Sequence, residues 1–117
     1  MIRSATPVLR TGNYPKARDF YVGVLGFRCV EEAGEPAIFG IFRRDGAEIF
    51  VHGHNGADAP YDHWRTYFTV EDVDALAREV QDAGGTLSKG VAATEYGMRE
   101  FEVTDPDGNV LCFGAEV

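Results

Sequence analysis

Apolar residues recur every three or four positions in two stretches of the chain, which predicts two amphipathic helices. The apolar stripe of the first helix consists of Ala17, Phe20, Tyr21, Val24 and Leu25. The stripe of the second helix consists of Val73, Leu76, Ala77 and Val80. Asn13 is a suitable N-cap for the first helix, which we expect Gly26 to end, and Gly84 and Gly85 end the second.

β-branched and aromatic residues are common in the segments around these helices and predict short strands. In the first half of the chain the predicted strands are residues 5–10, 27–32, 37–42 and 47–52. In the second half they are residues 64–70, 86–89, 99–104 and 110–113. Asp45-Gly46 is a hairpin turn signal, and the turn at 105–109 joins the last two strands. We expect the aspartates of that turn to hold its backbone rather than to act in catalysis.

Each half of the chain therefore has the order β-α-β-β-β, and residues 44–51 align with residues 106–113 as equivalent turn-and-strand segments. The prediction is an α+β fold in which two paired βαβββ modules form a curved, mostly antiparallel sheet around a cleft. We expect one domain made of modules at about 1–53 and 63–117. The segment 53–63 is rich in Gly, Asn, Asp and Pro, which indicates the joining loop.

The charge balance narrows the choice of ligand. The 117 residues include 11 basic and 19 acidic ones, and the formal net charge of -8 excludes the usual electrostatic basis for binding nucleic acid and favours a cationic small molecule. No apolar run approaches the roughly 20 residues of a membrane helix, and the first residues do not form a secretory signal, so we expect a cytoplasmic protein that does not contact membranes. Cys29 and Cys112 are expected to be reduced thiols.

Several motifs resemble those of the vicinal-oxygen-chelate (glyoxalase/bleomycin resistance/dioxygenase) superfamily, and most closely those of its bleomycin-resistance proteins. They are F-Y-x-x-x-L-G-F at 20–27, G-x-R-E-F at 97–101 and D-P-x-G-N at 105–109. The resemblance extends over essentially the whole chain. It implies paired βαβββ modules, usually within a homodimer that has ligand crevices at or near the subunit interface.

The same resemblance identifies the positions at which enzymes of this superfamily hold a divalent metal with His, Gln or Glu. In this chain those positions correspond to Thr6, Phe50, Arg65 and Cys112. A phenylalanine and a permanently charged arginine oppose metal binding sterically and electrostatically. We therefore expect no metal, no cofactor and no catalytic residues, and no metal-dependent glyoxalase or dioxygenase chemistry.

Two alternatives remain open at the level of sequence. His52, His54 and His63 have a spacing that could collect a transition metal, although polar residues on a solvated loop are the commoner case. Cys112 could be a nucleophile if a neighbouring base lowered its pKa, although a small packing residue is the simpler interpretation.

A ligand held without a metal must be bound by shape, aromatic stacking and charge. Side chains alternate along a strand, so Phe50 shares a face with Glu48 and His52, and Arg65 is expected to share one with Tyr67 and Thr69. The resemblance implies a crevice lined by aromatic residues and puts Phe39, His52, Tyr67 and Tyr96 near positions of that kind. The full set of candidate ligand-binding residues is Phe39, Glu48, Phe50, His52, Asp58, Asp62, Arg65, Tyr67, Tyr96 and Cys112. For the aromatic residues core packing is an equal alternative, and for the acidic ones simple solvation is the commoner case.

Together with these residues, the resemblance to bleomycin-resistance proteins implies a functional hypothesis: the protein sequesters a cationic, aromatic antibiotic of the bleomycin class without modifying it. One alternative is a metal-dependent glyoxalase- or dioxygenase-type enzyme on the same scaffold. Another is a binder of an unrelated small molecule, because one fold hosts many functions.

Overall fold

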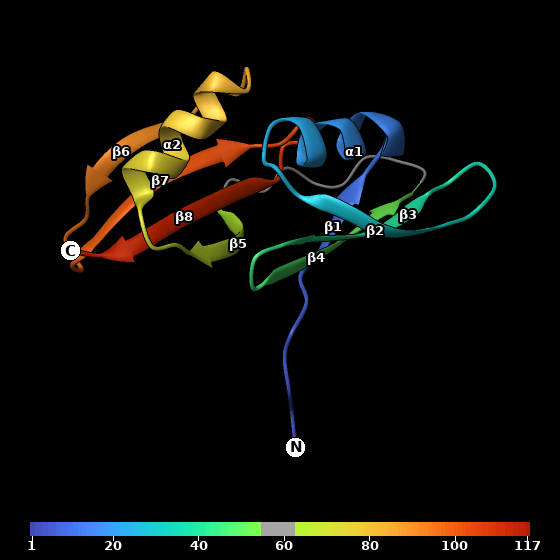
Figure 1. Cartoon of the computed structure of the whole chain (residues 1–117), viewed down its shortest axis with the longest axis horizontal. Coiled ribbons are helices and arrows are strands. Elements are labelled where there is room, and N and C mark those ends of the chain that lie inside the picture. The colour runs from blue at the N-terminus through green and yellow to red at the C-terminus, as the bar shows by residue number, and fades with distance from the viewer. Residues whose placement is uncertain (55–62) are drawn as a thin grey trace. The chain divides into compact units, whose positions relative to one another are not determined.

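The computed structural model describes residues 1–54 and 63–117, and the chain divides into two compact units, Met1–Ala59 and Pro60–Val117 (Figure 1). Each unit contains one helix and a four-stranded sheet, in the order β-α-β-β-β. The α+β class and the two βαβββ modules are thus confirmed. That both modules belong to one domain and surround a cleft stays a prediction.

The first unit is built from β1 (Val8–Thr11), α1 (Tyr14–Gly23), β2 (Arg28–Ala33), β3 (Phe39–Arg44) and β4 (Ala47–Gly53). The strand order in its sheet is β1-β4-β3-β2, with β1 parallel to β4 and the other pairs antiparallel. The predicted hairpin is confirmed: β3 and β4 are joined by Asp45 and Gly46, with Asp45 at a φ of 50°.

The first helix begins and ends close to where it was expected. The Asn13 side chain accepts a hydrogen bond from the amide of Lys16 at 3.2 Å. The regular helix α1 ends at Gly23, and Gly26, at a φ of 70°, turns the chain out of the helical direction. Leu25 nevertheless remains buried, since the chain curls back so that the amide of Phe27 donates to the carbonyl of Tyr21.

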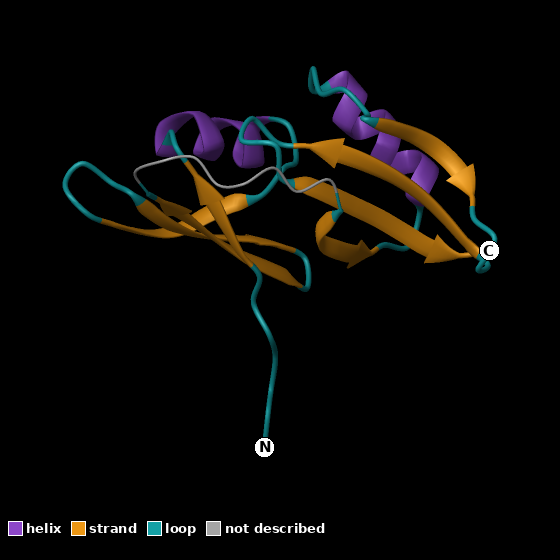
Figure 2. Cartoon of the chain, turned by 180° about the vertical axis from the view of Figure 1, so that it is seen from behind, coloured by secondary structure: helices purple, strands orange, loops and turns teal. Residues whose placement is uncertain are grey.

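One face of the first sheet packs against α1, as both cartoon views show (Figure 2). Tyr21 of the helix and Phe42, Ile49 and Val51 of the sheet are completely or almost completely buried. Because side chains alternate along a strand, the residues between them project from the opposite face of the sheet. The face of this sheet that is turned away from α1 therefore carries residues that no helix of its unit covers.

The second unit is built from β5 (Trp64–Thr69), α2 (Val73–Asp82), β6 (Lys89–Ala93), β7 (Met98–Thr104) and β8 (Val110–Glu116). Its strand order, β5-β8-β7-β6, repeats the first, again with one parallel pair, β5 with β8. Asp72 caps α2 by accepting from the amide of Ala75 at 3.0 Å.

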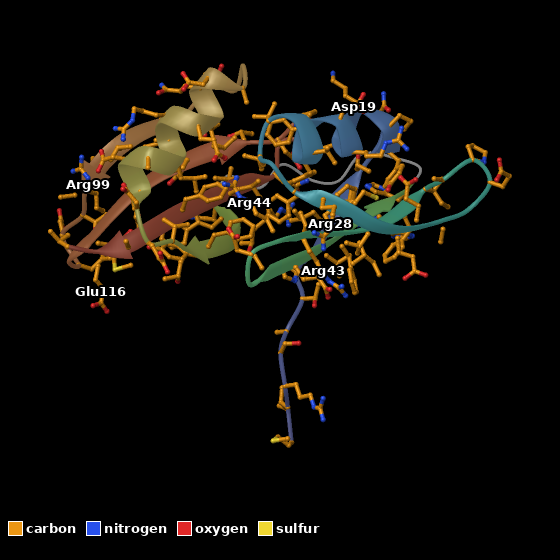
Figure 3. The ribbon with its side chains drawn as sticks, in the orientation of Figure 1. Asp19, Arg28, Arg43, Arg44, Arg99 and Glu116 are labelled. Carbon is orange, nitrogen blue, oxygen red and sulfur yellow. The ribbon has the colours of Figure 1, made fainter. Side chains whose placement is uncertain are left out.

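The core of the second unit lies between α2 and one face of its sheet. Phe101 stacks on Phe113 with ring centroids 5.0 Å apart, and Phe68 stacks on the other side at 4.9 Å. Arg99, labelled in Figure 3, lies on the same face and donates twice to Asp74 of α2, each time at 2.9 Å. The odd-numbered residues of β7 thus face the helix, and its even-numbered residues face away from it.

Several predicted strand boundaries are wrong. The strand expected at 86–89 lies instead at Lys89–Ala93, where it pairs with β7. The strand expected at 5–10 begins at Val8, and that expected at 37–42 lies at Phe39–Arg44, since the two-residue turn lets β3 continue to Arg44. The strand expected at 110–113 continues to Glu116, which pairs with Met98. In these cases pairing with a neighbouring strand decides the boundary.

No helix among the described residues is long and apolar enough to cross a membrane.

Candidate functional site

The face of the second sheet that is turned away from α2 carries two carboxylates, from Glu100 and Glu102 of β7. Strand register places Glu102 beside Cys112 of β8, and Cys112 in turn beside Tyr67 of β5. These side chains share a face because their neighbours along the strands, such as Phe101, are buried under the helix.

Aromatic side chains surround these two carboxylates and donate to them. The Tyr67 hydroxyl donates to Oε2 of Glu100 at 2.8 Å, and the Tyr96 hydroxyl donates to Oε1 at 2.7 Å. The indole N–H of Trp64 donates to Glu102 at 3.0 Å, and the Trp64 ring lies 5.0 Å from that of Tyr67. Glu100 is only 4% exposed, whereas Tyr96 is 62% exposed. The result is a buried carboxylate with aromatic rings between it and solvent.

The protonation of these groups follows from their surroundings. Burial, with the hydrogen bond to Glu100, raises the pKa of Tyr67, and the hydrogen bond to Glu100 raises the pKa of Tyr96 to about 12. Both hydroxyls therefore remain donors at neutral pH. Burial, with the nearby Glu100 and Glu102 carboxylates, raises the pKa of Cys112 to about 12. A buried, neutral thiol supports the packing role of Cys112 and speaks against a nucleophilic one.

A bulge in β5 adds a residue to the predicted site. The register between β5 and β8 shifts between Trp64 and Thr66, so Arg65 is the extra residue of a bulge. The bulge brings Trp64 onto the face of Tyr67, as the short distance between their rings indicates. Arg65 is exposed, and that it shares this face with Tyr67 stays a prediction.

A pocket of about 280 Å³ opens beside Glu100. It is lined by Lys89 and two alanines of β6, by residues 94–96 of the following turn, and by Glu100 itself. Tyr96 and Glu100, which are hydrogen-bonded to each other, thus both border a space large enough for a small chemical group.

The first unit brings four predicted residues together on the sheet face that is turned away from α1. The Phe39 ring lies 5.3 Å from that of Phe50 and 6.2 Å from that of His52. Glu48 lies on the same face, where it accepts from Arg43 (Figure 3) at 2.6 Å and from the Thr6 hydroxyl at 3.2 Å. Arg43 lowers the pKa of Glu48, so this carboxylate is charged and already has a cationic partner.

Asp58 and Asp62 lie outside the described residues. His52 and His63 are exposed and His54 is half-buried. Within residues 1–54 and 63–117, no three or more His, Cys, Asp or Glu side chains form a group that could hold a metal ion.

The metal of the superfamily's enzymes does not fit the four positions that the resemblance identified. Thr6 is engaged with Glu48, Phe50 packs on Phe39, and Arg65 carries a permanent positive charge. Cys112 would have to lose a proton from a thiol with a pKa of about 12. These residues do not form a ligand set for a divalent ion, which prefers carboxylate, imidazole or amide donors.

Two residues of the site were missed at the level of sequence. Glu100 lies between Arg99 and Phe101, so strand alternation alone was enough to place it on the face opposite Phe101. Trp64 reaches the site through the bulge at Arg65, and no local pattern in the sequence indicates a bulge there.

Comparison with known proteins is consistent with this fold. The profile of the Glyoxalase/Bleomycin resistance protein/Dioxygenase superfamily matches residues 3–113. The chain belongs to this superfamily. Among curated proteins, none matches the chain.

Solved structures of the superfamily's fold resemble the chain over its whole length. A bleomycin resistance determinant encoded on the transposon Tn5 has a TM-score of 0.83 and 22% identity, with 98% of each chain covered. A glyoxalase-related enzyme from Clostridium phytofermentans has a TM-score of 0.80 and 19% identity, covering 100% of this chain and 97% of its own. TioX from Micromonospora sp. ML1 has a TM-score of 0.76 and 20% identity, covering 97% of this chain and 100% of its own. At these identities the likeness shows the fold of the superfamily and nothing finer.

Proposed function

We propose that this superfamily member binds and sequesters a cationic, aromatic antibiotic of the bleomycin class without modifying it. The observation that supports this proposal best is the combination of Trp64, Tyr67 and Tyr96 with the buried carboxylate of Glu100 on one sheet face. Aromatic side chains can stack on the planar rings of such a drug, and a carboxylate attracts its positive charge.

The first unit supports the same kind of ligand. Phe39, Phe50 and His52 form a cluster of rings on a sheet face that no helix of that unit covers. A net charge of -8 adds a long-range attraction for cations. We therefore keep the predicted ligand-binding set and add Trp64 and Glu100 to it.

Sequestration needs no catalytic group, because a drug that is held by the protein is kept from its DNA target by mass action. The residues at the four superfamily metal positions support a binding protein over a metalloenzyme. We further propose that the protein acts in the cytoplasm as a homodimer.

Calorimetric titration with metal-free and with copper-loaded bleomycin tests this function. We expect saturable binding at micromolar or lower protein concentration, and the Trp64→Ala variant to bind more weakly because it loses a stacking surface. Val22→Ala, at an exposed residue of α1, is the matched control and should bind as the unchanged protein does. The absence of a saturable binding signal with both forms of the drug would contradict the proposal. So would turnover of a hemithioacetal or catechol by protein that carries a divalent metal.

A further inference from the structure

Glu100 is a buried carboxylate with no cationic side chain among the described residues that are hydrogen-bonded to it. It is 4% exposed, and the described side chains that are hydrogen-bonded to it are all neutral: they are the hydroxyls of Tyr67 and Tyr96 and the thiol of Cys112. Removing a carboxylate from water is costly unless a positive charge or a full set of donors compensates. These neutral donors supply no positive charge and leave part of its roughly four acceptor sites unused. Glu100 therefore still has acceptor sites that can receive donors from a ligand.

Those acceptor sites border a cavity. Glu100 lines the pocket of about 280 Å³ together with Tyr96, a residue that is 62% exposed. The small side chains of Ala92 and Ala93 leave the pocket open. Its volume is below that of most drug-sized sites, so it suits one functional group or the end of a ligand rather than a whole drug.

The charges around the pocket favour a cation. Glu95 and Glu100 carry two negative charges, and Lys89 carries one positive charge. Glu102 lies two residues along β7 from Glu100, on the same face of the sheet. Its carboxylate adds to the negative electrostatic potential around the pocket. The exposed Tyr96 ring offers a further attraction, since cations bind to the faces of aromatic rings.

We propose that this pocket receives an ammonium or guanidinium group of the ligand, with Glu100 as its counter-ion. The inference rests on the proposed function and names the part of the ligand that the site recognises. Glu48, the alternative anchor in the first unit, already has Arg43 as its cationic partner at 2.6 Å. Among the described side chains that are hydrogen-bonded to Glu100 none is cationic, so binding a cation there would offset its cost of burial.

The hydrogen-bonding capacity of Glu100 also predicts which cations bind. A carboxylate only accepts, so the best ligands carry N–H donors that can point at Oε1 and Oε2. A quaternary ammonium has the same charge but no N–H group, and it would interact with Tyr96 without satisfying Glu100. The pocket should therefore prefer an N–H cation to a fully methylated one, and both to a neutral alcohol.

Small aromatic probes test this inference independently of any drug. We would titrate the protein at pH 7 with benzylamine, benzyltrimethylammonium and benzyl alcohol, following the backbone amides of residues 92–94 by NMR. The unchanged protein should bind benzylamine at least about tenfold more tightly than benzyl alcohol, with the quaternary cation between them. If bleomycin failed to bind in the separate calorimetric titration, the proposed function would be overturned. The preference of the pocket for benzylamine over benzyl alcohol would be unaffected by that outcome.

Matched variants then assign the preference to Glu100. Glu100→Gln should remove the preference for benzylamine over the alcohol, whereas Glu95→Gln, which removes an equal charge from an exposed residue of the same pocket, should retain most of it. Lys89→Gln, also at an exposed position, should raise benzylamine affinity about two- to threefold, and it remains informative if Glu100→Gln does not fold. Equal affinity for amine and alcohol in the unchanged protein, a preference that survives Glu100→Gln, or no gain with Lys89→Gln would overturn the inference.

Discussion

Tyrosine hydroxyls donate to glutamate carboxylates in both units. Tyr14 donates to Glu32 at 2.7 Å in the first unit, and Tyr67 and Tyr96 donate to Glu100 in the second. An ionised tyrosine could not donate and would be repelled by the carboxylate. Burial accordingly raises the pKa of Tyr14 and of Tyr67, and the hydrogen bond to Glu100 raises that of Tyr96 to about 12.

These shifts predict a loss of stability at alkaline pH. A tyrosine whose pKa is higher in the folded than in the unfolded protein contributes stability that is fully present below the unfolded pKa. Above pH 10.0, the ordinary tyrosine pKa, the unfolded chain ionises first, so stability falls as pH rises toward about 12. Urea unfolding at about pH 9 and about pH 11 would measure this fall.

The double variant Tyr67→Phe/Tyr96→Phe is the comparison for that measurement, because it keeps both rings and removes both ionisable hydroxyls. We expect the fall in unfolding free energy between the two pH values to be smaller in the double variant. Equal falls in the two proteins would mean that these hydroxyls are not the origin of the alkaline sensitivity.

At the scale of elements, the turn between β7 and β8 depends on one buried side chain. Oδ1 of Asp105 accepts from the amides of Asp107 and Asn109 at 2.9 and 2.8 Å, and Oδ2 accepts from the Asn109 side chain at 2.8 Å. Asp105 is 5% exposed, so these donors would be left without their acceptor if it were removed. The prediction that the aspartates of this turn hold its backbone is confirmed for Asp105.

Asp105→Ala should therefore destabilise the protein by about 2–4 kcal/mol, since it leaves several poorly solvated donors unpaired. Denaturant unfolding measures the loss. Asp105→Asn retains one acceptor oxygen and should cost less. If the alanine variant were as stable as the unchanged protein, the turn would be held by its backbone alone.

A glycine in β8 makes room for the hydrogen bond between Tyr67 and Glu100. Gly114 lies opposite Glu100 in register, and a Cβ at Gly114 would collide with the Tyr67 hydroxyl and lie 3.0 Å from Cγ of Glu100. Gly114→Ala should displace the Tyr67 hydroxyl and destabilise the protein by about 1–3 kcal/mol.

Gly90→Ala is the matched control for that prediction, because Gly90 lies in strand β6 of the same sheet and a Cβ there meets nothing within 4 Å. We expect the control to stay within about 0.5 kcal/mol of the unchanged protein in denaturant unfolding. Equal stability of the two alanine variants would contradict the proposed crowding at Gly114.

These elements also show which parts of the structure the sequence can predict. The Asp45-Gly46 hairpin and the Asp105 turn were predicted because their residues act within a few positions of one another. Strand β6 was misplaced because Gly90, Ala92 and Ala93 carry little pattern of their own, and pairing with β7 decides where the strand lies. The bulge at Arg65, which brings Trp64 to the site, likewise depends on the register with β8.

At the scale of the whole molecule, the duplication of a β-α-β-β-β unit was predictable because each half repeats the same periodicities and the same Asp-Gly turn before its last strand. The set of residues that forms the site was less predictable from the sequence. The acidic residues among the predicted ligand-binding residues were Glu48, Asp58 and Asp62. The pairing of Glu48 with Arg43 was missed because the predicted strand ended at residue 42, whereas β3 continues to Arg44 and places Arg43 opposite Glu48.

Net charge and the buried carboxylate should contribute differently to ligand binding, and salt separates the two contributions. The charge of -8 attracts cations over distances that salt screens, since the Debye length is about 10 Å at 0.1 M and about 3 Å at 1 M. The affinity for benzylamine should therefore fall several-fold between roughly 0.02 and 0.5 M NaCl, while that for benzyl alcohol stays nearly constant. A direct contact with Glu100 is screened much less, so part of the preference for the amine should persist at high salt in the unchanged protein and disappear in Glu100→Gln. Loss of the whole preference at high salt in both proteins would mean that the overall field, rather than a contact with Glu100, selects the cation.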